Sequence, residues 1–84
     1  MIKVNARTLD FFDRQVISMI VEKYGIDEKI ALRKFIKSET YQMLIDVETE
    51  VYKMSPRIVF DMWESEIVTG SPRNSQYIRG EMNE

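Results

Sequence analysis

The spacing of the apolar residues is the feature that most constrains the fold of this sequence. Isoleucine and valine together number 17 and leucine only three, a composition that by intrinsic propensity favours strands. The apolar side chains nevertheless recur at three- and four-residue steps, as in Leu9, Phe12 and Val16, and this spacing places them on one face of a helix. Because periodicity over a long segment outweighs propensity, the sequence predicts an all-α fold.

Helix start signals divide the first half of the chain. The spacing predicts a helix over 9–24, with Thr8 as its N-cap. Asp27 then caps a second helix, whose run is interrupted at Ser38. Ser38 can itself cap a short third helix over 39–45, or the two can continue as one bent helix. We favour the break.

Ser55 and Pro56 are the sharpest local signal in the second half. Serine suits the N-cap, and proline suits the first helical position, where its missing N–H costs nothing. A last helix is therefore predicted over 56–69, ending at Gly70. The preceding segment, 46–54, alternates in character, which suits either a loop or a short extended strand, and we favour the loop.

The length of 84 residues suits one small domain. We expect a bundle of three to four short helices around one core in residues 1–70, with Trp63 in that core. Residues 71–84 contain a proline and a glycine with few large apolar groups, a composition typical of a flexible tail.

The chain contains no histidine and no cysteine, and this removes the commonest catalytic chemistries. An imidazole base, a thiolate nucleophile and a zinc site of the usual kind are all excluded. Asp61 and Glu64 lie three residues apart and share a helix face, but such spacing is typical of a solvated surface. We therefore expect a protein that is not an enzyme and has no catalytic residues, no metal site and no cofactor.

The same composition bears on location. The absence of cysteine suits a reducing compartment, so a cytoplasmic protein is expected. No stretch approaches the roughly 18 uninterrupted apolar residues that a membrane-spanning helix needs, so no membrane association is expected.

Negative charge collects on the last predicted helix and its approach. Residues 47–70 carry five acidic and two basic side chains, a net of −3. An acidic helix beside a tail with aromatic residues would suit binding to a basic protein surface. The residues predicted to contact this partner are Phe60, Asp61 and Glu64 on the helix, and Tyr77, Ile78 and Arg79 in the tail.

A basic ridge on the second predicted helix supports an alternative function. Lys29, Arg33 and Lys37 recur every four residues, and Lys34 adds a fourth cation. Such a helix could contact nucleic acid, so the alternative is a small DNA-binding transcriptional regulator. Within residues 25–46 four positive charges meet four negative charges, however, and local pairs of Glu28 with lysine are expected.

The first predicted helix carries apolar residues beyond its main stripe. Ile17 and Val21 exceed what one small core is expected to cover. They predict a homodimer interface on this helix.

A series of residues spread over positions 26–68 follows a recognisable pattern. It comprises Ser38-Glu39-Thr40-Tyr41, Leu44-Ile45-Asp46, Glu48-Thr49, Tyr52, Ser55-Pro56 and Val59-Phe60-Asp61. This pattern resembles that of short, uncharacterised bacterial all-helical proteins encoded in toxin–antitoxin-like operons. The resemblance implies an antitoxin-like or regulatory protein that binds a protein encoded nearby. The family pattern has glycine at position 50, where this chain has Glu50.

Overall fold

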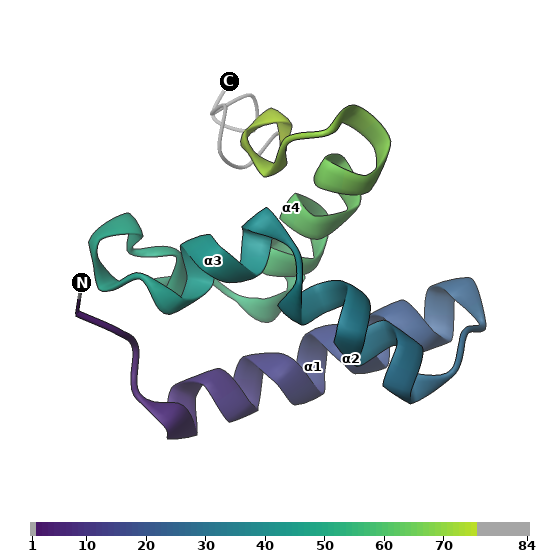
Figure 1. Ribbon diagram of the computed structural model, residues 1–84, viewed down its shortest axis with the longest axis horizontal. Coiled ribbons are helices and arrows are strands. Elements are labelled where there is room, and N and C mark those ends of the chain that lie inside the picture. Colours follow the sequence, from purple (N-terminus) through teal and green to yellow (C-terminus); the bar gives the residue numbers. More distant parts are fainter. Residues whose placement is uncertain (1, 76–84) are drawn as a thin grey trace.

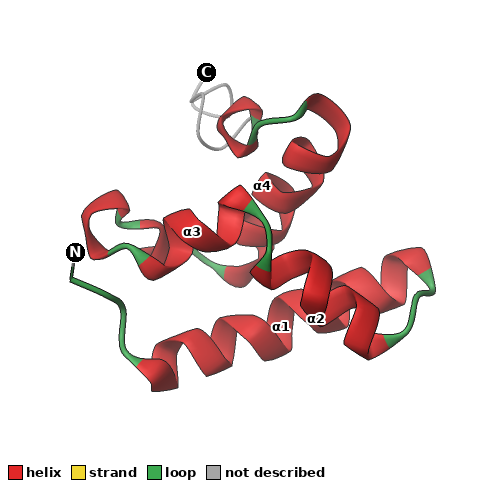
Figure 2. Cartoon of the chain, in the orientation of Figure 1, coloured by secondary structure: helices red, strands yellow, loops and turns green. Residues whose placement is uncertain are grey.

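The computed structural model describes residues 2–75, and its architecture is helical (Figure 1). Its four α-helices are α1 (Ala6–Tyr24), α2 (Glu28–Ile36), α3 (Glu39–Ile45) and α4 (Pro56–Thr69). No strand occurs in the described part of the chain, as Figure 2 shows, and paired extended backbone is limited to a single bridge between Lys3 and Asp46. The all-α prediction is confirmed.

The helices pack around α1, which runs along the base of the molecule in Figure 1. After α1, Gly25 takes a left-handed conformation with φ of 64°, and the chain reverses so that α2 packs on the C-terminal half of α1. The third helix lies above, and α4 contacts both α1 and α3. None of the described helices has the length and apolar character required to cross a bilayer.

One hydrophobic core joins all four helices. Phe35 of α2 is fully buried, and its ring meets that of Tyr41 of α3 edge to face, with centroids 5.1 Å apart. Trp63 is buried as predicted, and Phe60 stacks on it from the same helix at 6.3 Å. The other buried members include Phe12, Val16, Ile20, Ala31, Leu44, Val59 and Met62.

The predicted caps hold at three of the four helices. Asp27, Ser38 and Ser55 each accept a hydrogen bond from a backbone amide at the start of α2, α3 and α4. At α1 the predicted cap is wrong. The helix begins three residues earlier, because Asn5, a residue type favoured at the N-cap over threonine, accepts from the amide of Thr8 at 2.9 Å.

The segment 46–54, predicted as a loop, is not a strand and contains two 3-10 turns, Val47–Thr49 and Val51–Lys53. Asp46 accepts from the amide of Glu48 at 3.0 Å, and Thr49 Oγ1 donates to the carbonyls of Met43 and Asp46. These short-range bonds make the turns regular. Glu50, between the turns, has φ of 59°, so it adopts the left-handed conformation that glycine takes without steric cost.

The folded domain extends past Gly70, where the tail was predicted to begin. Residues Pro72–Asn74 form a third 3-10 turn packed on α4, and both Pro72 and Ser75 are fully buried. The Ser75 hydroxyl donates to the Asp61 carboxylate. Burial of Pro72 and this bond hold a segment whose composition alone indicates little structure. Residues 76–84 lie outside the described residues.

Candidate functional site

The predicted partner-binding residues of α4 are engaged within the chain. The side chain of Phe60 is only 5% exposed and belongs to the core. Asp61 is half-buried and accepts the hydrogen bond from Ser75. Tyr77, Ile78 and Arg79 lie outside the described residues.

Glu64 binds the C-terminal end of α1 to α4. Its Oε2 accepts from Lys23 Nζ and from the Tyr24 hydroxyl, each at 2.5 Å. Lys23 Nζ also lies 5.8 Å from the centre of the Phe60 ring. Partial burial on its own would raise the pKa of Glu64, but the hydrogen bonds from Lys23 and Tyr24 hold that pKa below its ordinary value. Glu64 therefore forms an ion pair between two helices.

Glu66, which the sequence analysis did not select, caps the neighbouring helix α3. Its carboxylate accepts from the amides of Glu39 and Thr40, both at 2.9 Å, and from Thr40 Oγ1 at 2.8 Å. A carboxylate suits this position because the first amides of a helix lack intrahelical partners and carry partial positive charge. No local pattern reveals such a cap, since donor and acceptor are 26 to 27 residues apart.

These contacts reduce the acidic charge that α4 offers to a binding partner. Asp61, Glu64 and Glu66 all have intramolecular partners, so the charge sum of 47–70 overstates what a binding partner would meet. The binding role of Phe60, Asp61 and Glu64 stays a prediction.

The cations of α2 differ from the acidic residues of α4 in their contacts. Lys29, Arg33 and Lys34 lie on α2, and Lys37 is its C-cap residue. All four are exposed, and none forms an ion pair with any residue in the described range 2–75. The predicted pairs with Glu28 do not form there. The other acids of this segment serve elsewhere, because Asp27 and Asp46 accept from backbone amides and Glu39 pairs with Arg73.

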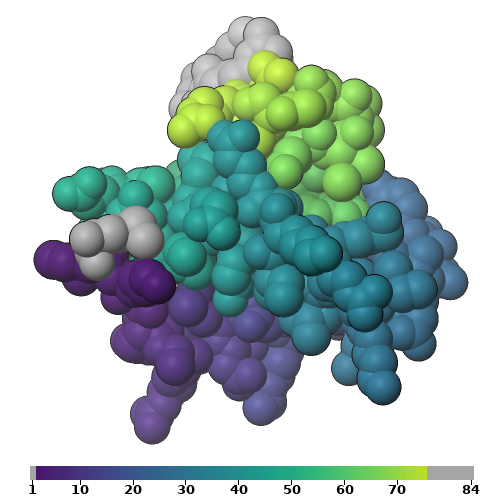
Figure 3. All heavy atoms as spheres, viewed as in Figure 1, coloured from purple at the N-terminus to yellow at the C-terminus, as the bar shows by residue number. Residues whose placement is uncertain are grey.

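Three branched apolar side chains lie beside these cations. Ile30, Leu32 and Ile36 are 43%, 39% and 40% exposed. We call these seven residues the basic–apolar face of α2, and Figure 3 shows α2 on the near face of the molecule. The helical repeat of 100° per residue sets Lys29, Arg33 and Lys37 in a central row. Leu32 and Ile36 flank the row on one side, and Ile30 and Lys34 flank it on the other.

Known proteins give no assignment. No family model, curated protein or solved structure matches this chain.

A hollow in the described surface lies along α1, facing the start of α2. It has a volume of about 470 Å³, and its lining includes Asp13, Ile17, Val21, Glu22 and Glu28. Ile17 is buried and Val21 packs against the core, so the chain itself covers much of the apolar surface that predicted a homodimer. In the described range no group of three or more acidic side chains is placed to hold a metal ion.

Asp13 is the unusual titratable group of this hollow. Its Oδ1 is buried and has no hydrogen-bond partner in the described residues. Burial, followed by the negative charge of Asp10, raises the pKa of Asp13 above its ordinary value of 3.8. The carboxylate therefore destabilises the folded state when it is ionised.

Replacing Asp13 with asparagine is expected to stabilise the protein at neutral pH. A raised folded-state pKa means that the folded chain holds the proton more tightly, so the parent loses stability as pH rises through that pKa. The asparagine variant has no charge at position 13, so it does not lose stability in this way. We expect Tm to rise by about 2–4 °C at pH 7, or roughly 0.5 kcal/mol in a domain of this size. Melts followed by circular dichroism between pH 3 and 8 test this.

The difference in Tm between the variant and the parent should shrink toward zero as the pH falls below 3.8, because Asp13 is then protonated in both the folded and the unfolded chain. Replacing Asp10 with asparagine would be a poorer control for charge removal, because it would also remove the ion pair between Asp10 and Arg14. A constant difference across the whole pH range would contradict the titration of Asp13.

Proposed function

We propose that this protein is a non-enzymatic interaction module that binds an acidic protein through the basic–apolar face of α2. The main observation is that the four cations of this face have no ion-pair partner among residues 2–75, while three half-exposed aliphatic side chains flank their central row. Unpaired cations on a surface attract and orient an oppositely charged partner. The aliphatic side chains supply apolar area that such a partner can bury.

This role suits an antitoxin-like or regulatory protein that binds the product of a neighbouring gene in the cytoplasm. The proposal assigns recognition to α2, whose cations form no ion pair with residues 2–75, in addition to the residues predicted on α4. It requires no chemical step and no cofactor.

A DNA-binding regulator is the second candidate, and the central row of α2 favours it. Lys29, Arg33 and Lys37 succeed one another by one helical turn, an arrangement that can contact successive phosphates. The half-exposed Ile30, Leu32 and Ile36 weigh against it, because protein–DNA interfaces are more polar than protein–protein interfaces.

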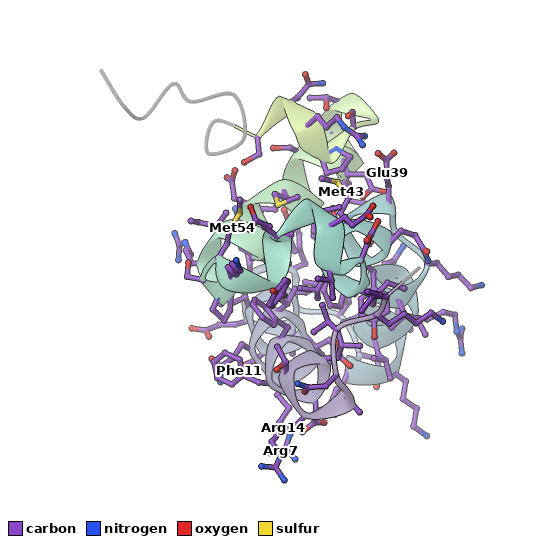
Figure 4. All side chains as sticks on the ribbon, turned by 90° about the vertical axis from the view of Figure 1, so that its left-hand side faces the viewer. Arg7, Phe11, Arg14, Glu39, Met43 and Met54 are labelled. Atoms are coloured by element: carbon purple, nitrogen blue, oxygen red, sulfur yellow. The ribbon has the colours of Figure 1, made fainter. Side chains whose placement is uncertain are left out.

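Affinity capture with two matched double variants tests the proposed function. Lys29→Glu with Arg33→Glu reverses two charges on α2. Lys3→Glu with Arg7→Glu makes the same chemical change at the same spacing, and Figure 4 shows Arg7 pointing outward from α1. We expect one stoichiometric protein to be captured from a lysate of the source organism by the parent and the Lys3/Arg7 variant, and to be lost with the α2 variant.

Equal capture by all three proteins would contradict a role for α2. A duplex DNA that is shifted by the parent at low salt, and not by the α2 variant, would favour the second candidate, because phosphate contacts are strongly salt-dependent. Circular dichroism confirms that both variants remain folded.

A further inference from the structure

We infer that the partner presents an amphipathic α-helix, with a row of carboxylates at four-residue spacing, and that this helix packs along the basic–apolar face of α2. The inference rests on the proposed function and adds the chemistry and conformation of the segment that is bound. Four features of α2 lead to it.

The first feature is the length and spacing of the cation row. Lys29 and Lys37 are eight residues apart, which corresponds to about 12 Å along a helix at 1.5 Å per residue. Acidic residues at positions i, i+4 and i+8 of a second helix span the same distance. Three carboxylates can therefore face Lys29, Arg33 and Lys37 in register.

The second feature is the placement of the apolar side chains on both flanks of that row. Leu32 and Ile36 lie on one side and Ile30 on the other, each about 40% exposed. A facing helix that carries aliphatic residues beside its carboxylates would bury all three. A partner with acidic charge alone would leave these side chains in water.

The third feature concerns the backbone of the bound segment. An extended peptide gains affinity by adding to a sheet edge, and residues 2–75 contain no strand. A polyproline segment needs a groove lined by aromatic rings, and none of the seven residues of this face is aromatic. A helix satisfies its backbone hydrogen bonds internally, so it needs only the side chains that α2 offers.

The fourth feature argues against a lipid surface. A helix that lies in a membrane interface buries a central apolar stripe and keeps its cations at the edges. On α2 the order is reversed for three of the four cations, because Lys29, Arg33 and Lys37 are central and the aliphatic side chains flank them. This arrangement suits a partner whose charge is concentrated in a narrow row.

Synthetic peptides provide a direct test. The probe is a helix-forming peptide with glutamate at i, i+4 and i+8 and leucine on both sides of that row. One control peptide has the same composition with the glutamates distributed around the helix. The other control carries a central proline, which breaks the helix. Binding to the full chain is measured by fluorescence anisotropy and by isothermal titration calorimetry.

We expect the probe peptide to bind at least about tenfold more tightly than either control, a difference of about 1.4 kcal/mol. Lys29→Glu with Arg33→Glu should weaken its binding by about tenfold or more, and Lys3→Glu with Arg7→Glu should leave it unchanged. Leu32→Ser with Ile36→Ser should weaken binding several-fold without altering its dependence on salt, because these side chains contribute apolar contact.

Equal binding of the probe and the proline peptide would overturn the helical partner and leave an acidic partner in place. No binding of any peptide, together with α2-dependent protein capture, would overturn this inference while the proposed function stands. Loss of α2-dependent capture as well would overturn both. A 20-base-pair duplex that binds through α2 more tightly than the probe peptide would overturn both in favour of the DNA-binding candidate.

Discussion

Replacing Phe35 with alanine is expected to lower the free energy of unfolding by about 3–5 kcal/mol. Phe35 is fully buried and meets Tyr41 edge to face, and Ala31 is the only other buried residue of α2. An 84-residue domain has a total stability on the order of 4–12 kcal/mol, so the variant should be marginally folded. Urea unfolding followed by the fluorescence of Trp63, the single tryptophan, measures the change.

Two companion variants separate packing from other effects. Phe35→Leu fills part of the space and should cost about 1–1.5 kcal/mol. Leu32→Ala changes an exposed residue of the same helix and should cost less than about 1 kcal/mol. If the free energies of unfolding of the Phe35→Ala and Leu32→Ala variants differed by less than about 1 kcal/mol, the packing of Phe35 would not be what holds α2 to the core. Because α2 carries the basic–apolar face, loosening this helix should also weaken binding of the acidic helical peptide.

The features that were predicted correctly are those determined by residues close together in the sequence. The caps at Asp27, Ser38 and Ser55 depend on a side chain and an amide two or three residues away, so the sequence contains both partners. The helical periodicity is local in the same sense. Asn5 was missed although asparagine is favoured at an N-cap over threonine, because the apolar spacing begins at Leu9, just after Thr8, and only the course of the backbone shows where the helix starts.

Ion pairs could not be predicted in this way. Glu64 bonds to Lys23, 41 residues away, and Arg73 pairs with Glu39, 34 residues away. A net charge summed over a segment counts these groups as free, and the prediction of a binding surface on α4 depended on such a sum. The same sums gave α2 no net charge, because they subtracted acidic residues such as Asp27, Glu39 and Asp46, which bond to groups other than the α2 cations.

The end of the domain was placed too early for a related reason. Composition made residues 71–75 resemble a tail, but burial of Pro72 and the bond from Ser75 to Asp61 depend on the surface that α4 presents. A short segment can be ordered by one buried ring and one hydrogen bond when a folded neighbour supplies the complementary groups.

Replacing Glu66 with alanine is expected to cost about 2–4 kcal/mol of folding free energy. The carboxylate accepts three hydrogen bonds at the start of α3, two from backbone amides and one from the hydroxyl of the fully buried Thr40. Hydrogen bonds to a charged acceptor contribute about 1.5–3 kcal/mol each, and bonds that share an acceptor are not additive. Losing the carboxylate also removes the charge that faces the helix dipole. Urea unfolding measures the total cost.

Glu66→Gln keeps one oxygen acceptor and should cost about 1 kcal/mol, while Glu22→Ala removes an exposed glutamate of α1 and should cost less than about 0.5 kcal/mol. Hydrogen exchange locates the effect, because the amides of Glu39 and Thr40 should lose protection in Glu66→Ala before those of α1 do. A double-mutant cycle with Thr40→Val should show a coupling of about 1 kcal/mol. Independent effects of the two substitutions would mean that the bond from Thr40 Oγ1 contributes little, and equal protection of the Glu39 and Thr40 amides in Glu66→Ala and the parent would contradict the capping of α3 by Glu66.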